Sequence, residues 1–421
     1  MDQAEQRRRR LAQLLDLAQT YRGWTRKELA RALRRDPTKL IPGSGIPKLD
    51  LVVDLAGVLD WPVGVVIGCM WNGNPAGSDG IGEAQPSADF ESLDAASSQA
   101  YQQGKYTLMI DLAKQAYDVA ETPQERARAC NRQAGGWDGL GRYSKLRDAV
   151  QLGLQERSIS PDFRRMLQVN LANAYYTLWS LTESGAVAQG LVNWFKENPA
   201  ESVRDRIVHA FAHYVAGHTF RRLITQEPEN ATVLGFRAKE HLEISHDLHC
   251  RLSEELEIDA YSGIGNTCKG GIIEAEVELD QRDPDEALET IVDRLDAVVD
   301  VEDENAPVGP WLESYGWWCI FGCNIALRHL TDERRLQHYM AIFTNKADEI
   351  ANRSDNWSMR ERAFTMQYTR WQRAIDATGF EIPNVIDKED VQLITGTMGR
   401  FPTFRETGWR ILKTAKVVRN N

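Results

Sequence analysis

Residues 25–66 read TRKELARALRRDPTKLIPGSGIPKLDLVVDLAGVLDWPVGVV, and this stretch carries several helix-start signals in close succession. Thr25 and Glu28 match a capping box, in which the hydroxyl accepts the N3 amide and the carboxylate accepts the N-cap amide. An Asp-Pro pair then predicts a further, very short helix over 36–41, with Asp as the N-cap. The apolar run 49–59 predicts a longer helix. The stretch therefore indicates a compact group of short helices.

The sequence on either side sets the limits of this group. Upstream, residues 6–21 have leucines at helical spacing on one face, which predicts an amphipathic helix. Downstream, residues 72–93 are rich in Gly, Pro, Ser and Asp and have no apolar periodicity, which is typical of a linker. We therefore expect a first domain over 1–71 and a linker over 72–93.

Charge is distributed unevenly along the chain. The net charge of the 421 residues is −11, but residues 1–48 contain 12 Lys and Arg against 5 Asp and Glu, a balance of +7. The remainder carries 38 against 56, a balance of −18. A basic head on an acidic body favours a head that faces nucleic acid, although a solvated charged helix would give the same count.

The pattern of the first domain resembles the helix-turn-helix of the Cro/repressor (XRE) family. That family begins a helix with Thr or Ser followed by Leu-Ala, as in Thr25 to Ala30, and has a Pro about nine residues before Ala-x-x-Leu, as from Pro47 to Ala56. The other positions that match are Leu33, Leu51, Leu55, Leu59 and Val65. The resemblance covers residues 8–68 and implies a domain that contacts double-stranded DNA.

The segment that would read DNA departs from the family pattern. The family's recognition helix is an uninterrupted turn and a half, whereas the stretch here is shortened and closed by Pro42. Only Thr38 and Lys39 are expected to reach a base edge, although direct readout needs several bidentate side chains. Phosphate contacts, which position a protein without specifying sequence, are better supplied. The DNA-binding candidates are Arg26, Lys27, Arg34, Arg35, Thr38, Lys39 and Lys48.

The body shows helical periodicity almost throughout and few alternating, strand-like runs. Several breaks between its segments carry helix-start signals, such as Ser160-Pro161 and Asp283-Pro284. The clearest predicted helices are Tyr106–Ala120, Glu125–Leu140, Phe163–Leu178, Val203–Leu223 and Val233–Leu256.

A degenerate repeat is visible in the body. Gly104 and Tyr106 precede one predicted helix, and Gly141 and Tyr143 precede another 37 residues later. This spacing resembles tetratricopeptide repeats, which are tandem helical hairpins of about 34 residues. We therefore expect an all-α chain with an α-solenoid of such hairpins over 94–300, although a generic helical array remains the alternative. A helical continuation or cap is expected over 301–421.

A ligand-binding groove is expected on the first helices of these hairpins, which line a concave surface in repeat proteins. Asparagine side chains there can hold a peptide backbone, because an amide both donates and accepts hydrogen bonds. The ligand-binding candidates are Asn131, Asn170, Asn173 and Tyr176. The acidic body favours a positively charged peptide, and simple packing of these side chains is the alternative.

Catalytic and metal-binding patterns are weak. His209 and His213 have the spacing of a zincin run, but position 210 is alanine, so the general base of a metalloprotease is missing. A structural metal shared with His241, His246 and neighbouring residues is left as an alternative to ordinary packing. We expect no cofactor, no metal and no enzymatic activity.

The remaining sequence features concern location. The six cysteines have no CxxC pairing, which favours reduced thiols in the cytoplasm. No run of about 18 apolar residues is present, so no membrane span is expected.

Together these features resemble the peptide-sensing regulators of the RRNPP group, which join an XRE head to a repeat body. The resemblance implies a transcriptional regulator that binds DNA and a peptide or protein effector and forms a homodimer. The alternative is a non-enzymatic interaction scaffold whose helix-turn-helix has lost specific DNA reading.

Overall fold

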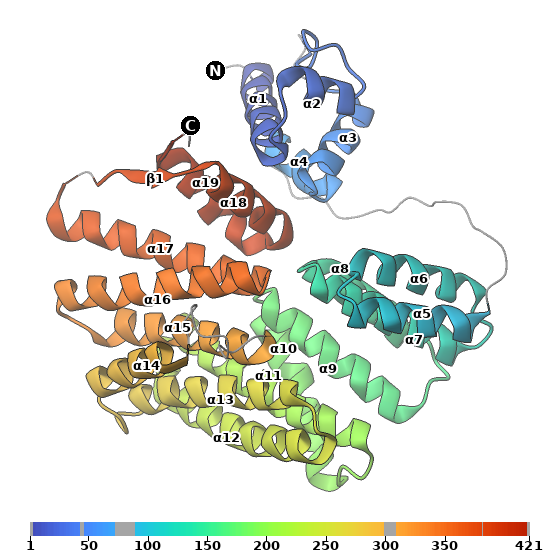
Figure 1. The fold of residues 1–421 in the computed structure, drawn as a ribbon, viewed down its shortest axis with the longest axis vertical. Helices are drawn as coiled ribbons and strands as arrows, with labels where there is room; N and C mark the ends of the chain where they lie inside the picture. The colour runs from blue at the N-terminus through green and yellow to red at the C-terminus, as the bar shows by residue number, and fades with distance from the viewer. Residues whose placement is uncertain (1–2, 43–45, 72–88, 299–308, 381, 419–421) are drawn as a thin grey trace. The chain divides into compact units, whose positions relative to one another are not determined.

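The computed structural model describes residues 3–42, 46–71, 89–298, 309–380 and 382–418. The described chain is all-helical, with 19 α-helices and two short strands, and 82% of it is helix (Figure 1). It divides into two compact units. Unit 1 joins residues 1–85 to residues 380–421, and unit 2 comprises residues 86–379. The all-α class expected from the sequence is confirmed.

Unit 1 begins with the helices α1 (Gln3–Arg22), α2 (Arg26–Ala32), α3 (Leu49–Leu59) and α4 (Val63–Trp71). The capping box at the start of α2 is formed: the amide of Glu28 donates to the Thr25 hydroxyl, and the Glu28 carboxylate accepts the Thr25 amide at 2.7 Å. Leucines of α1 and α3, and those in and directly after α2, are buried in the core. The fully buried ones are Leu11, Leu14, Leu29, Leu33, Leu55 and Leu59.

The prediction of a very short helix over 36–41 is wrong. Residues 36–42 form turns, in which Asp36 Oδ1 accepts both the amide and the hydroxyl of Thr38, at 2.8 and 2.6 Å. Pro42 has no amide to donate, and it disfavours the helical conformation at the residue before it. A helical turn cannot continue past such a position, so the Asp36 side chain stabilises a local turn instead.

The C-terminal segment completes unit 1. It contains β1 (Asn384–Ile386), α18 (Lys388–Arg400), the short 3₁₀ turn η2 (Pro402–Phe404), α19 (Arg405–Thr414) and β2 (Ala415–Val417). The two strands pair in parallel. Helix α18 packs against α1, and the Trp61 indole N–H donates to the Thr395 carbonyl at 3.1 Å. The stretch expected as a helical continuation over 301–421 is thus divided between the two units after residue 379.

Unit 2 is a succession of helices that pack chiefly against their neighbours in the chain. The predicted helices of the body are present, with ends within a few residues of those expected. The helices are α5 (Phe90–Gln102), α6 (Tyr106–Val119), α7 (Pro123–Gly139), α8 (Tyr143–Gln155), α9 (Pro161–Thr177), α10 (Leu181–Glu197), α11 (Val203–Gln226), α12 (Ala231–Leu256), α13 (Asp259–Glu278), α14 (Pro284–Val298), α15 (Gly309–His329), α16 (Glu333–Arg353) and α17 (Trp357–Thr378), with the 3₁₀ turn η1 (Pro228–Asn230).

The same turn recurs between successive helices of unit 2. Gly104 and Gly141 both have a left-handed backbone, with φ of 66° and 64°, and Trp179 occupies the third such turn with φ of 65°. In each turn the next residue's amide bonds a carbonyl five residues earlier, at 2.7–2.9 Å. The sequence spacing of 37 residues between the two glycines therefore reflects a repeated local structure.

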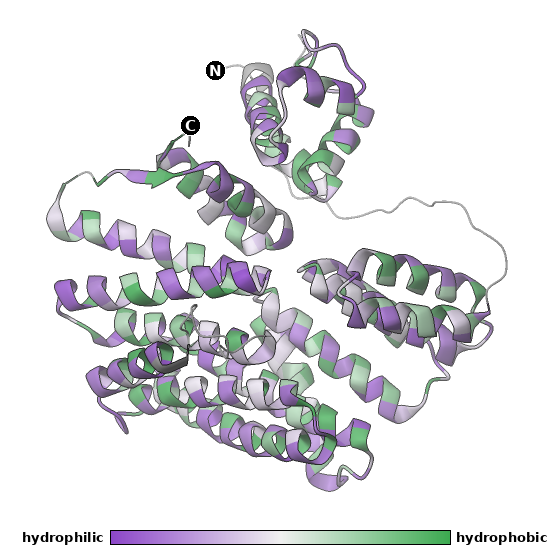
Figure 2. Cartoon of the chain, viewed as in Figure 1, coloured by the Kyte–Doolittle hydropathy of each residue, from purple (hydrophilic) through white to green (hydrophobic). Residues whose placement is uncertain are grey.

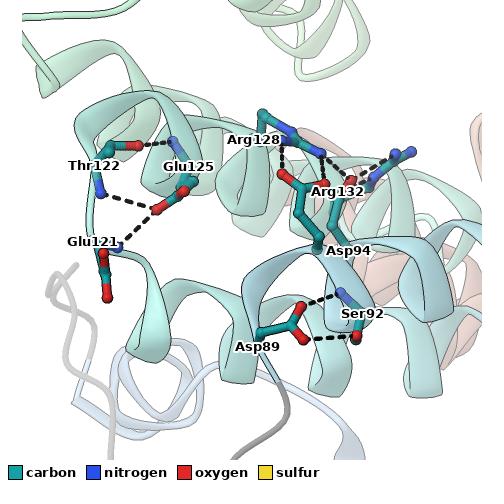
Figure 3. A network of polar contacts seen from close by, with 9 residues as sticks. Asp89, Ser92, Asp94, Glu121, Thr122, Glu125, Arg128 and Arg132 are labelled. Atoms are coloured by element: carbon teal, nitrogen blue, oxygen red, sulfur yellow. Dashed lines mark hydrogen bonds and ion pairs between the residues drawn. The ribbon is translucent and has the colours of Figure 1, made fainter.

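Hydrophobic and hydrophilic residues alternate along the helices of unit 2, as Figure 2 shows. Polar side chains also hold neighbouring helices together where α5 meets α7 (Figure 3). Arg128 makes two bonds to Glu91, and Arg128 and Arg132 both donate to Asp94, a carboxylate that is only 4% exposed. Burial alone would raise the pKa of Asp94, but the bonds from the two guanidiniums outweigh it and lower that pKa.

Within the described ranges, no single helix is long and apolar enough to cross a membrane. Helices α3 and α4 reach the required length and composition only when taken together, and the pair is bent by 112°.

Candidate functional site

The head presents part of the expected DNA-binding set at its surface. Lys27, Arg34, Lys39 and Lys48 are exposed, and none of them makes an ion pair with the residues that the structure describes. They lie on α2, in the turns that follow it and at the start of α3. These four side chains can contact phosphates, since an unpaired cation needs only to reach an anionic oxygen.

The other three expected DNA-binding residues are engaged within the head. Arg26 Nε donates to the carbonyl of residue 37 at 3.2 Å, and the Thr38 hydroxyl is bonded to Asp36. Arg35 forms an ion pair with Asp50 at 2.5 Å. Among the residues once expected to reach base edges, only Lys39 therefore keeps an unengaged side chain. The head's described surface has little means for base readout.

The asparagines expected to bind a ligand lie on α7 and α9. Asn170 donates to the side-chain oxygen of Asn131 at 3.0 Å, so these two amides are partly used by each other. Asn173 is half-buried on the same helix and makes no side-chain hydrogen bond within the described chain. Tyr176 is buried, and it accepts a bond from Arg222 through its carbonyl at 2.7 Å. The expected ligand-binding residues thus fall into two groups: the paired amides of Asn131 and Asn170, and Tyr176, which contacts an arginine.

A small hollow in unit 2 lies beside Tyr176. It is lined by Trp179, Arg221, Arg222, Thr225, Trp317, Ile320, Asn324 and Arg362, which come from α11, α15, α17 and the turn after α9. The Arg222 guanidinium lies 3.8 Å from the ring centre of Tyr176 and 4.4 Å from that of Trp179. The Arg362 guanidinium lies 4.8 Å from the Trp179 ring centre. Two cations therefore share one indole.

The arginines of the hollow differ in how their charge is balanced. Arg221 bonds the Glu274 carboxylate at 2.7 Å, and Arg328 pairs with the same carboxylate. Arg222 is only 5% exposed, yet neither it nor Arg362 has an ion pair within the described residues. Burial, reinforced by repulsion from Arg362, lowers the pKa of Arg222 to about 10, so this guanidinium stays charged at neutral pH. The hollow itself measures about 10 Å³, room for about one water molecule, so an anionic group would contact these guanidiniums at its mouth rather than enter it.

Trp179 itself adopts a conformation that is unfavourable for a bulky residue. The equivalent turns carry Gly104 and Gly141, which take a left-handed backbone without strain. A side chain in this region costs about 1–2 kcal/mol, and such strain persists where the surroundings over-determine it, commonly at functional sites. The indole of Trp179 is the part of this residue that offsets the strain, because the guanidiniums of Arg222 and Arg362 lie only 4.4 and 4.8 Å from its ring centre.

The histidines of α11 and α12 form a packed pair. The Nδ1 atoms of His213 and His241 lie 2.9 Å apart, and both rings are buried. Burial is the main cause that lowers the pKa of His213 to about 3 and that of His241 to about 4. Within the described ranges, no group of three or more His, Cys, Asp or Glu side chains is placed to hold a metal ion.

The arginine and tryptophan residues of the hollow were not among the expected site residues. Trp179, Arg222 and Arg362 are far apart in the sequence, so no local spacing joins them. The only local signal is the tryptophan at a position where the two preceding repeats carry glycine. No protein-family model matches the sequence, and no curated protein is significantly similar to it.

Proposed function

We propose that the protein is a non-enzymatic transcriptional regulator whose head contacts double-stranded DNA and whose body binds a peptide or protein effector. In this proposal the head is a degenerate XRE-like helix-turn-helix, the body is a tetratricopeptide-like solenoid, and the chain works as a cytoplasmic homodimer without a cofactor. The observation that carries the proposal is the group of arginines at Trp179, where neither Arg222 nor Arg362 makes an ion pair with the described residues. Such an arrangement is suited to a ligand rather than to stability.

The hollow also defines the chemistry of the effector. The body as a whole is acidic, but the charged side chains around Trp179 are arginines, two of which have no ion pair in the described part of the chain. A carboxylate of the effector, from an acidic side chain or a chain end, would bond guanidinium N–H groups of Arg222 and Arg362. Asn173 on α9 would hold the effector's backbone amide.

Effector binding can be tested with two pools of hexapeptides, one with free acidic groups and one with the same groups amidated. We expect the acidic pool to raise the melting temperature of the full chain and the amidated pool to leave it unchanged. Arg362→Gln should abolish this rise, because it removes a guanidinium that would bond the effector's carboxylate. The variant should still fold, since Arg362 is only half-buried. Arg237→Gln is the matched control, since Arg237 also lies over an aromatic ring, that of Phe220, but outside the hollow. Equal effects of both pools would contradict the proposal.

The part of the proposal that concerns DNA rests on the four exposed cations of the head. We expect binding of a duplex whose affinity falls steeply with salt and varies little with sequence. Replacing Lys27, Lys39 and Lys48 with Gln should lower the slope of log K against log salt by up to about 3, at about 1 per phosphate contact. Lys105→Gln, an exposed lysine of the body, should leave the slope unchanged.

The interaction scaffold is the second candidate, and the turns over 36–42 favour it. The segment that would read bases is not helical, and the hydroxyl of Thr38 is bonded within the turn. If no duplex is bound at any salt concentration, and neutralising Arg26, Lys27 and Lys39 together leaves activity intact, the scaffold replaces the regulator. Effector binding at Trp179 would remain valid in either case.

A further inference from the structure

A second site lies in unit 1, where the two ends of the chain meet. An open cleft of about 580 Å³ is bounded by α1, α4 and α19, which belong to the first and last parts of unit 1. Its lining residues are Arg10, Gln13, Leu14, Val65, Gly68, Cys69, Arg405, Glu406, Trp409, Arg410 and Lys413. Small-molecule sites usually occupy about 300–1,000 Å³, so the cleft has the size of a ligand pocket.

One part of the cleft lining, here called its floor, is apolar. Leu14 is fully buried, and Val65 and Cys69 are half-buried on α4. Burial raises the pKa of the Cys69 thiol, even though the charge of Arg405 opposes this. The thiol is therefore protonated and uncharged at neutral pH. Trp409 is half-buried on α19 and lines the cleft beside the Cys69 thiol, with which its side chain interacts. A flat ring of a ligand could stack on this indole.

The polar part of the cleft is cationic. Arg410 is paired with Glu406 at 2.5 Å, but Arg10, Arg405 and Lys413 make no ion pair within the described residues. Arg10 uses one nitrogen to donate to the Met70 carbonyl at 3.4 Å, and Arg405 uses Nε to donate to the Met398 carbonyl at 3.1 Å. These bonds hold the two guanidiniums in place and leave their other N–H groups available. A guanidinium held in this way bonds a carboxylate or phosphate strongly.

We propose that this cleft binds a small organic anion that carries a flat ring and a phosphate, carboxylate or sulfonate group. The ring would stack on Trp409 over the apolar floor, and the anionic group would bond Arg10, Arg405 and Lys413. A recessed cleft with an apolar floor suits a compact ligand better than a DNA backbone, which is contacted by protruding cations. This inference is independent of the proposed function, because it involves neither the Trp179 hollow nor the surface around Lys39.

The ligand would also connect the two ends of the chain. It would touch α1 and α4 on one side and α19 on the other, and would therefore stabilise the packing of residues 382–418 on the first four helices. Binding to the folded unit alone raises its stability by mass action.

The test uses the full chain and calorimetric titration at constant ionic strength. The probes are AMP, adenosine as its uncharged counterpart, and 1-anilinonaphthalene-8-sulfonate. We expect AMP to bind at least tenfold more tightly than adenosine. Lys413→Gln, at an exposed residue that cannot disturb folding, should weaken AMP at least fivefold. Trp409→Leu should weaken both AMP and the sulfonate, while Lys416→Gln, at an exposed lysine outside the cleft, should weaken neither.

Three results would overturn the inference. The first is that neither anionic probe binds. The second is that Lys413→Gln and Trp409→Leu leave both affinities unchanged. The third is that the same substitutions weaken duplex DNA binding without affecting AMP, which would make the cleft part of a nucleic-acid surface. Loss of DNA binding in the Lys27, Lys39 and Lys48 variant has no bearing on the AMP titration, so the two proposals fail separately.

Discussion

Trp179 concentrates several physical effects in one residue. Its backbone is left-handed, and two guanidiniums contact its indole. The corresponding turns of the preceding repeats have glycine at this position. A cation–π contact with a desolvated guanidinium contributes about 2 kcal/mol, which is comparable to the backbone strain. The indole also packs against the apolar cluster that contains Tyr176 and Phe220, so the contacts of the ring together outweigh the strain.

Replacing Trp179 with glycine separates strain from ring function. We expect Trp179→Gly to lower the free energy of unfolding by about 2–4 kcal/mol, because loss of the ring's packing and cation contacts exceeds the relief of strain. Binding of acidic peptides should be lost, since Arg222 and Arg362 lose the indole that places them. Chemical denaturation and peptide titration measure the two effects. Gly104→Trp, at an equivalent turn without the arginines, should destabilise the chain by at least 1 kcal/mol. Intact peptide binding in Trp179→Gly would refute this account.

The paired histidines give a pH dependence whose sign follows from their pKa values. The pKa of His213 falls to about 3 and that of His241 to about 4 in the folded chain, below the ordinary value of about 6.5. The unfolded chain therefore binds more protons between pH 6.5 and pH 4, and the free energy of unfolding should decrease as pH falls through this window. Urea denaturation at several pH values measures the slope. His213→Gln should make it shallower, and His338→Gln, at an exposed site, should not.

At the scale of elements, periodicity and caps predicted most helices of the body. Helix α9, for example, begins at Pro161, directly after the Ser160 expected as its cap. The helix predicted over 36–41 is absent because the stretch is too short, although Asp36 is a residue that favours a helix start. A helix must gain several hydrogen bonds to offset nucleation, and Pro42 ends the stretch before it can do so. Of the candidate site, only Tyr176 could be found from the sequence, because packing alone brings Arg222 to Tyr176 and Arg362 to Trp179.

The contact between α5 and α7 depends on one buried carboxylate. Asp94→Ala should destabilise unit 2 by about 2 kcal/mol, less than the 3–5 kcal/mol of a fully buried pair, because Arg128 keeps Glu91 and both guanidiniums are about a third exposed (Figure 3). Thermal unfolding of the full chain measures the effect. Asp148→Ala is the matched control, since its ion pair with Arg147 is exposed and should contribute less than about 1 kcal/mol. Equal effects of the two substitutions would show that burial of Asp94 does not matter.

At the scale of the whole molecule, no sequence pattern indicated that residues 380–421 would join the head. Their helical pattern continues that of the body, and the contacts that place them span more than 300 residues. Such contacts depend on shape rather than on periodicity. Gly399 of α18 shows this, because a Cβ on it would lie 2.5 Å from Cδ1 of Trp61. The absent side chain of Gly399 lets the indole reach the Thr395 carbonyl.

This close approach leads to opposite expectations for two helical glycines. Glycine to alanine within a helix normally stabilises by about 1 kcal/mol, and Gly190 of α10 has no neighbour within 4 Å of the added carbon. Gly190→Ala should therefore raise the melting temperature of unit 2 slightly. Gly399→Ala should instead destabilise unit 1 by about 1–3 kcal/mol, the usual effect of overpacking, because Trp61 must move. Calorimetry of each full-length variant measures both changes. If Gly399→Ala were stabilising, then the C-terminal segment would not be held against the head by this contact.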